Sequence, residues 1–266
     1  MTDTLQNRAH GLLLGLAAGD RIGGPLRMAL HLAESLLARG RFASADVGLR
    51  YLGWWRQGAF DTGPTVAEVL RLVAAGFSFH DAATHVDARA KGLTAGCNPA
   101  HRSAPLAMLA ALHDTDLPRV AIAEATLTHR HPLAGDTSAA VTVLCRALLR
   151  GRTWPDALAL AAEDRLPETR DALTGGGELS DGGFSPDALR AAIHFVGTSD
   201  SLPAALERSI AFAGPANYCP VLVGSIGGAR WGATGVPATL LTLHEQELPR
   251  LHSIAATLAR GWHLSA

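Results

Sequence analysis

Apolar residues recur every three or four positions along most of the chain, the spacing that lines one face of an α-helix. Leu30, Ala33 and Leu37 share such a face and predict a helix over residues 26–38. The same spacing predicts further helices over residues 66–73, 120–127, 139–149, 155–162, 186–196 and 203–212. Proline stands at or near several of these starts, where its fixed φ suits the first turn. The pattern predicts an all-α protein.

Composition supports this prediction and bounds the number of domains. Alanine and leucine, both good helix formers, dominate, while aromatic residues make up only 5%. Apolar residues make up 48% of the 266 residues, enough for one sizeable core or two small ones. The long glycine-rich stretch at residues 174–183 has the same helical texture on both sides, so we interpret it as a loop. We therefore expect residues 1–266 to form a single compact multi-helix domain.

Charge and cysteine content exclude several classes of protein. There are 23 Lys and Arg against 24 Asp and Glu, so no overall field favours nucleic acid or an anionic membrane. Cys97, Cys145 and Cys219 form no CxxC pair, which disfavours a disulfide scaffold or a zinc ribbon. No apolar run approaches the ~20 residues of a membrane span, and we interpret residues 11–19 as a buried helix rather than a signal peptide. We expect a soluble cytoplasmic protein with neither a nucleic-acid nor a membrane partner.

The candidate chemistry lies where the helical pattern is interrupted. Five interruptions are rich in polar and small residues, namely GD at 19–20, FDTGP at 60–64, GCNPAHR at 96–102, THRHP at 128–132 and GPANYCP at 214–220. Loops at one end of a helical bundle can converge, and helix N-termini then direct amides at a ligand. Capping and turn formation is the alternative for each loop taken alone.

Six short motifs follow one another over residues 11–237. They are GxxxGxAxGD at residues 11–20, MAL and AESLL at 28–37, FDTGPT at 60–65, GCNPAHR with a following proline at 96–105, TH at 128–129, and spaced glycines from 214 to 232. In this order they resemble the ADP-ribosylglycohydrolase family. The resemblance implies that family's all-α fold and hydrolysis of an N- or O-glycosidic bond at the anomeric carbon of an ADP-ribosyl group.

The resemblance also implies two Mg²⁺ ions, held by acidic clusters just before the MAL helix and at the start of the last motif. Here those segments read GGPLR at residues 23–27 and PANY at 215–218, without a carboxylate. Mg²⁺ prefers hard oxygen ligands in octahedral geometry, and Asp20 with Asn217 would not build a two-metal site. Arg27 would place a cation where a metal sits in the family. We therefore expect no metal ligands and no cofactor.

Without a metal, side chains would have to support the oxocarbenium-like transition state and position a water molecule. Asp61 is the first candidate for base or charge stabiliser, Asp20 is the second, and His101 is the third catalytic candidate. Turn or helix-terminal carboxylates are the structural alternatives for both aspartates.

Further residues in the same loops are candidates for binding the substrate. Arg102 offers a planar fork of donors for a phosphate or a ribose hydroxyl, and His129 can orient a ring or a water. Asp136 can pair with His129 or Arg102, with a solvated helix carboxylate as the alternative. The remaining candidates are Asn98, Asn217 as a donor to ribose, and Tyr218 as a stacking ring.

Two functions remain open. The first is a hydrolase of an ADP-ribosyl conjugate or a related ribosyl compound that works without the two Mg²⁺ ions. The second is an inactive relative that binds ADP-ribose or acts as a regulatory or structural protein. The expected partner is a small-molecule or protein-linked ADP-ribosyl-type ligand, and the oligomeric state stays open.

Overall fold

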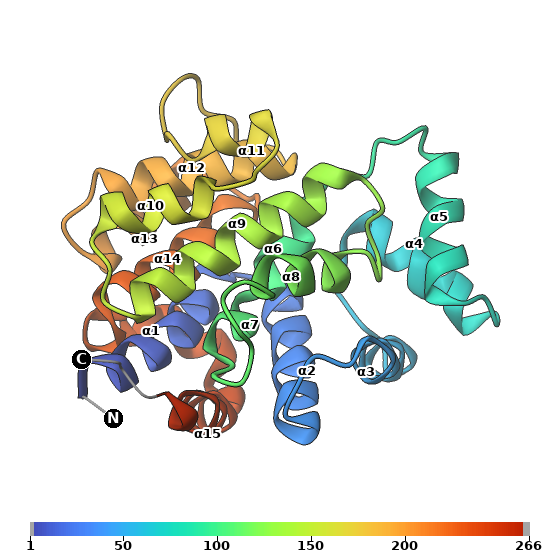
Figure 1. The fold of residues 1–266 in the computed structure, drawn as a ribbon, viewed down its shortest axis with the longest axis horizontal. Coiled ribbons are helices and arrows are strands. Elements are labelled where there is room, and N and C mark those ends of the chain that lie inside the picture. The colour runs from blue at the N-terminus through green and yellow to red at the C-terminus, as the bar shows by residue number, and fades with distance from the viewer. Residues whose placement is uncertain (1–2, 263–266) are drawn as a thin grey trace.

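The computed structural model describes residues 3–262, and within this range the secondary structure is helical except for one isolated bridge between Gly96 and Phe184 (Figure 1). The α-helices are α1 (Asp3–Gly19), α2 (Gly24–Arg39), α3 (Ser44–Arg56), α4 (Gly63–Ala74), α5 (Phe79–Arg89), α6 (Asn98–Arg102), α7 (Ala104–Met108), α8 (Leu117–Ala125), α9 (Pro132–Leu149), α10 (Trp154–Ala162), α11 (Pro167–Ala172), α12 (Ser185–Gly197), α13 (Leu202–Ala213), α14 (Cys219–Trp231) and α15 (Leu248–Leu258). The 3-10 helices are η1 (Ala233–Gly235), η2 (Ala238–Glu247) and η3 (Ala259–Gly261). The predicted all-α class is confirmed.

Local signals in the sequence set many helix boundaries, as most of these helices carry proline in the first turn. Thr153 caps α10 by accepting a hydrogen bond from the Asp156 amide at 3.3 Å. Ser185, which also precedes a proline, differs from this pattern. It is the first residue of α12, and its hydroxyl donates to the Leu133 carbonyl at 3.2 Å instead of capping its own helix.

Three helices form the centre of the main hydrophobic core. Residues 11–19, which end α1, and residues 219–229 of α14 are all buried, and α9 is buried along nearly its whole length. A helix that is apolar on every side is typical of a position inside the protein rather than on its surface. The remaining helices pack around this centre (Figure 1).

The helices α1 and α14 pack against each other in an antiparallel contact that brings their backbones very close together. A Cβ atom built on Gly15 would lie 2.1 Å from the carbonyl oxygen of Gly224, and one built on Gly228 would lie 1.9 Å from that of Gly11. Only glycine permits backbones to touch in this way. Because Gly19 meets Pro220, the end of α1 is held beside the start of α14.

A smaller hydrophobic cluster joins α3, α4 and α5 at one edge of the molecule (Figure 1). Its centre includes Leu52, Val69 and Val86, one from each of these helices. This edge is therefore a satellite of the main core, and α4 bridges the two clusters because Val66 and Leu70 belong to the main one.

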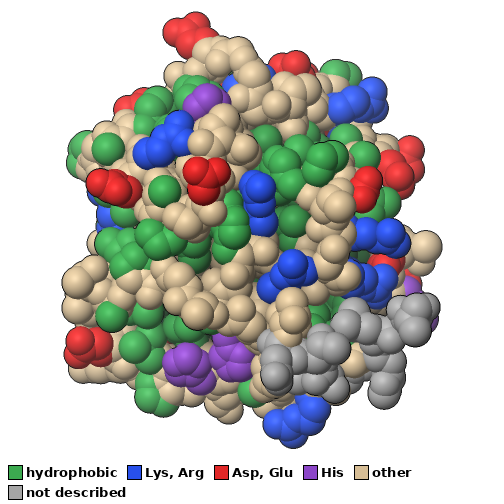
Figure 2. Space-filling view, turned by 90° about the vertical axis from the view of Figure 1, so that its left-hand side faces the viewer, with side chains coloured by type: hydrophobic (Ala, Val, Ile, Leu, Met, Phe, Trp, Pro, Cys, Tyr) green, Lys and Arg blue, Asp and Glu red, His purple; other side chains and the backbone are tan. Residues whose placement is uncertain are grey.

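The surface reflects the balanced composition. The face drawn in Figure 2 carries acidic and basic side chains interspersed with apolar and uncharged ones, in keeping with a net charge of −1. Within residues 3–262, no helix combines the length and apolar character needed to cross a bilayer. The expected cytoplasmic location stays a prediction.

Candidate active site

Four of the five polar interruptions meet around one cavity of about 290 Å³. The cavity lies where several helices begin or end, and its lining combines polar side chains with apolar ones such as Val66 and Leu93. Six of the nine predicted site residues line it, namely Asp61, Asn98, His101, His129, Asn217 and Tyr218. All residues of this lining lie in the described part of the chain. Among them Asp61 is the only Asp, Glu, Lys or Arg, and the histidines are His101 and His129.

Asp61 stands just before α4 with a left-handed backbone, φ 50°. Its Oδ2 accepts a hydrogen bond from the Gly24 amide at 3.3 Å. Burial raises the pKa of Asp61 above its ordinary value, and the nearby Asp20 carboxylate raises it further, while hydrogen bonds from Gly24 and Asn217 act in the opposite direction. A carboxyl group that holds its proton to a higher pH suits exchange of protons with a substrate or water.

Asp20 lies behind the cavity rather than in its lining. Its carboxylate is 1% exposed and accepts four hydrogen bonds. The donors are the amides of Ile22 at 3.2 Å, Gly23 at 2.7 Å and Leu26 at 2.8 Å, and Nδ2 of Asn217 at 2.8 Å. Asp20 therefore shapes the turn into α2 and fixes Asn217.

Asn217 connects Asp20 to the cavity. While its Nδ2 donates to Asp20, its Oδ1 accepts from the backbone amide of Arg21 at 3.1 Å. Both ends of the amide are therefore fixed before any ligand arrives. The next residue, Tyr218, is 41% exposed, and its ring lies against Gly183 at the edge of the cavity.

Two buried histidines form another part of the lining. Burial lowers the pKa of His101 to about 4 and that of His129 to about 3. Both imidazoles are therefore neutral at ordinary pH. Within the described residues, the buried Nε2 atom of His101 has no hydrogen-bond partner, which in a native protein calls for an explanation such as a ligand or a water.

Arg102 and Asp136 were predicted to bind the substrate, but neither of them lines the cavity. The side chain of Arg102 is fully buried, and its Nε donates to Glu124 Oε1 at 2.7 Å. Asp136 pairs with Arg165 at 3.0 Å rather than with His129 or Arg102. In both ion pairs the partner residue is distant in sequence, and the charged group that was expected to bind the substrate is bound within the protein instead.

Glu124 is the residue of this region that the sequence reasoning missed. It is 0% exposed and accepts hydrogen bonds from both Arg102 and the Tyr51 hydroxyl, the latter at 2.8 Å. Its position in the sequence could have revealed it, because Glu124 follows Val120 by four residues and therefore lies on the apolar face of α8. A charge on such a face indicates a buried ionic partner.

The rim of the cavity is closed by backbone pairing between two segments. The Cys97 amide donates to the Gly183 carbonyl at 3.0 Å, and the Ser185 amide donates to the Ala95 carbonyl at 2.8 Å. These bonds flank the isolated bridge and attach the glycine-rich segment to the loop that carries Asn98 and His101. Burial raises the pKa of the Cys97 and Cys219 thiols to about 12, so neither is a nucleophilic thiolate.

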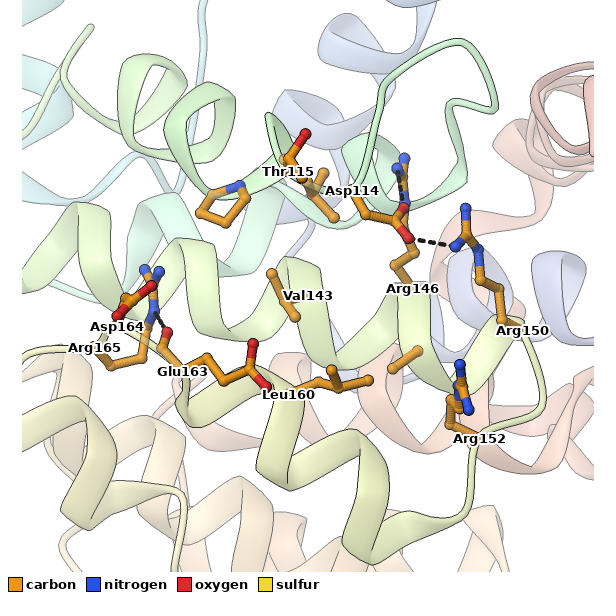
Figure 3. A pocket seen from close by; sticks show the side chains of 13 residues that line it. Asp114, Thr115, Val143, Arg146, Arg150, Arg152, Leu160, Glu163, Asp164 and Arg165 are labelled. Atoms are coloured by element: carbon orange, nitrogen blue, oxygen red, sulfur yellow. Dashed lines mark hydrogen bonds and ion pairs between the residues drawn. The ribbon is translucent and has the colours of Figure 1, made fainter.

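A larger cavity, of about 450 Å³, lies between the C-terminal half of α9, α10 and residues 114–118 (Figure 3). None of the predicted site residues lines it. Figure 3 shows Arg146 and Arg150 directed toward Asp114. Arg146 also donates to the backbone carbonyls of Leu106 and Ala107 in α7 and of Leu109 and Leu112 in the segment that follows it. Its charge therefore serves to hold α7 and the following segment in place, and the smaller cavity, which the predicted residues line, is the candidate active site.

The fold places this protein among the helical glycohydrolase-like proteins, and the chain belongs to the ADP-ribosylglycohydrolase family, whose sequence profile matches residues 26–265. One relative is the ADP-ribosyl-(dinitrogen reductase) glycohydrolase of Rhodospirillum rubrum, which is 24% identical over 282 residues that cover 93% of each chain. A solved structure described as an ADP-ribosylglycohydrolase-related protein complex matches with a TM-score of 0.81 and 26% identity, over 98% of this chain and 99% of that one. The resemblance drawn from the motifs is confirmed.

The residues at the position of the family's Mg²⁺ pair do not fit two such ions. Both oxygens of Asp20 already accept hydrogen bonds from N–H groups, three on Oδ1 and one on Oδ2. Arg27 instead forms an ion pair with Glu247. Among residues 3–262, no group of three or more His, Cys, Asp or Glu side chains is arranged to hold a metal ion. Mg²⁺ favours several hard oxygen ligands, and this donor set does not supply them.

Proposed function

We propose that this chain is a hydrolase of an N- or O-glycosidic bond in an ADP-ribosyl conjugate or a related ribosyl compound, and that it works without the two Mg²⁺ ions. The observation that carries the proposal is the placement of Asp61. Its carboxyl group, with a raised pKa, lines a cavity in which two buried neutral histidines and two asparagines also stand. These groups suit an uncharged sugar ring and its hydroxyls.

In the proposed reaction, the bond between the anomeric carbon and the leaving nitrogen or oxygen breaks, and positive charge develops on the ribose ring. The Asp61 carboxylate stabilises that charge and accepts a proton from the attacking water, whose oxygen forms the new bond to the anomeric carbon. The leaving group takes a proton from the protonated Asp61 or from solvent, so the products are the free ribosyl hydroxyl and the protonated leaving group.

The other residues have supporting roles in this proposal. Asp20 holds Asn217 rather than touching the substrate, because its oxygens are already engaged. His101 offers its unpartnered Nε2 to a substrate hydroxyl or to the attacking water. Tyr218, at the exposed edge, stacks on a base or an aglycone.

The test combines binding and turnover under chelation. ADP-ribose is titrated calorimetrically into the purified protein in Mg²⁺ and again in excess EDTA, and release of ADP-ribose from ADP-ribosylated arginine peptides and O-linked conjugates is followed in both. Equal binding and hydrolysis in both conditions support the proposal. Hydrolysis only with Mg²⁺ contradicts its metal-independent part, whereas binding without turnover of any conjugate supports the alternative of an inactive ADP-ribose-binding relative.

A further inference from the structure

Three polar side chains form a connected row from the buried ion pair to the cavity. The Nη2 atom of Arg102 donates to the Thr128 hydroxyl oxygen at 2.9 Å. The same oxygen lies 2.9 Å from Nδ1 of His129. Arg102 and Thr128 are 0% exposed and His129 is 3% exposed, so water does not compete for these bonds.

The chemistry of each group fixes where the protons lie. A guanidinium group can only donate, so the Thr128 oxygen accepts from Arg102. The hydroxyl then has one proton to donate, and within the described residues its remaining hydrogen-bond partner is Nδ1 of His129. If Nδ1 carried a proton, the hydroxyl proton would be buried without an acceptor, which is unfavourable. Nδ1 is therefore the acceptor, and the proton of the neutral ring is on Nε2.

The surroundings also keep this ring neutral. Burial lowers the pKa of His129 most, the positive charge of Arg102 lowers it further, and His101 lowers it as well. The imidazole thus has one N–H group over the pH range in which most proteins are active, and the row of hydrogen bonds determines which nitrogen carries it.

The protonated nitrogen is the one at the cavity. His129 and Gly96 both line the cavity, and a Cβ atom built on Gly96 would lie 3.3 Å from Nε2 of His129. The absence of a side chain at Gly96 therefore leaves Nε2–H accessible beside the backbone of the rim.

Arg102 orients a second cavity residue in the same way. Its Nη1 donates to Oδ1 of Asn98 at 2.6 Å, so the amide oxygen of Asn98 faces the guanidinium. The Nδ2 group is directed the other way, toward the Thr62 carbonyl at 3.4 Å, a residue that also lines the cavity.

We propose that Arg102 and Thr128 are positioning residues that hold His129 in the neutral tautomer protonated on Nε2, so that the cavity presents a fixed hydrogen-bond donor to an acceptor oxygen of its ligand. With Asn98 held by the same guanidinium, the cavity presents two oriented N–H donors. The use of these donors in binding rests on the proposed function, but the tautomer itself does not.

The tautomer is measured directly in the ¹⁵N-labelled full-length protein by two-bond ¹H–¹⁵N correlation spectra of the histidine rings, with His129→Gln used to assign the signal. We expect His129 to be protonated on Nε2 between pH 5 and 8. Thr128→Ser keeps the hydroxyl and retains this pattern, whereas Thr128→Val, similar in size but without the hydroxyl, loses the preference for Nε2.

Two results overturn the proposal. One is a wild-type ring protonated on Nδ1, a measurement that needs no variant to fold. The other is a folded Thr128→Val protein, judged by its amide spectrum, that keeps the Nε2 tautomer unchanged.

Binding separates this proposal from the proposed function. In calorimetric titrations of ADP-ribose, Thr128→Val weakens binding about tenfold, the loss of one oriented hydrogen bond, and Thr128→Ser changes it less than about twofold. Wild-type protein that fails to bind ADP-ribose contradicts the proposed function while leaving the tautomer measurement intact. Equal affinity of the Val and Ser variants contradicts the role of Nε2–H in binding.

Discussion

Asn217 donates from Nδ2 to Oδ1 of Asp20 across 2.8 Å, although 197 positions separate the two residues. The bond connects the segment before α14 with the end of α1. It forms because the glycines of the two helices let their backbones touch, so that Gly19 meets Pro220. The position of a cavity residue therefore depends on glycines that do not themselves line the cavity.

Replacing Gly15 by alanine will strain this helix contact. The new Cβ atom would lie 2.1 Å from the Gly224 carbonyl oxygen, so the helices must separate, and we expect a loss of about 3 kcal/mol in the free energy of unfolding. Gly53→Ala is the matched control, because Gly53 lies within α3 with open space around it, and alanine there stabilises by about 0.5–1 kcal/mol. Urea titrations measure both, and equal stability of the two variants contradicts the proposed contact.

A substitution at Asn217 can replace its hydrogen bond to Asp20 by electrostatic repulsion. Asn217→Asp sets a second carboxylate against Asp20, and we expect a loss on the order of 3 kcal/mol in unfolding free energy at pH 7. The loss shrinks toward pH 4, because one proton shared by the two carboxyls relieves the repulsion. Asn217→Ala removes the bond without adding charge, so its loss of about 1–2 kcal/mol changes little with pH. Parallel pH profiles for the two variants would contradict this account.

Asp61→Asn separates activity from stability. Asparagine tolerates the left-handed backbone at this position, and removal of the carboxylate lowers hydrolysis by at least about 100-fold. The free energy of unfolding, in contrast, is not lowered by this substitution at neutral pH. Because the pKa of Asp61 is raised in the folded state, the unfolded chain ionises first, and folding loses stability as pH rises above the ordinary carboxyl range.

The uncharged variant avoids that loss. At pH 7 Asp61→Asn is therefore at least as stable as the wild type, and the difference disappears below the ordinary pKa of aspartate. Surface Asp116→Asn serves as the control for both measurements. Retention of full turnover by Asp61→Asn would exclude Asp61 as the base.

Breaking the buried pair of Arg102 and Glu124 is expected to lower the free energy of unfolding strongly. Glu124→Gln leaves the guanidinium buried without its counter-charge, and we expect a loss of about 3–5 kcal/mol. Arg119→Ala breaks a pair on the surface, where Arg119 is 73% exposed, and changes stability by less than about 1 kcal/mol. Thermal and urea unfolding distinguish the two, and a mild effect of Glu124→Gln would mean that the pair is hydrated.

The helical class and the loops of the site could be predicted because both depend on short-range signals. Apolar spacing and proline mark the helices, and polar interruptions mark the loops that carry Asp61, His101 and Asn217. Helix starts were less reliable, since α9 begins at Pro132, seven positions before the predicted start at 139, where tertiary burial extends the helix beyond its clearest periodicity.

The partners of the site residues could not be predicted, because they depend on tertiary packing. Arg102 and Asp136 are charged residues of the kind that bind ligands, but in the structure each forms an ion pair within the protein. Arg102 pairs with Glu124, and Asp136 pairs with Arg165. Nothing local to Arg102 indicates that α6 is buried or that Glu124, 22 positions later, faces it. The sequence therefore predicts which residues gather at one place more reliably than which of them remain free to bind.

The contact between α1 and α14 also determines when the site can form during synthesis. During synthesis, Asp61, His101 and His129 leave the ribosome long before α14 does. At that stage α1 still lacks the helix that packs against its glycines Gly11, Gly15 and Gly19. Contacts between such distant segments form late in folding. A chain released before residue 214 would thus carry most of the lining residues without Asn217, Tyr218 and the helix α14 that packs against α1, and it would remain a target for chaperones and proteases.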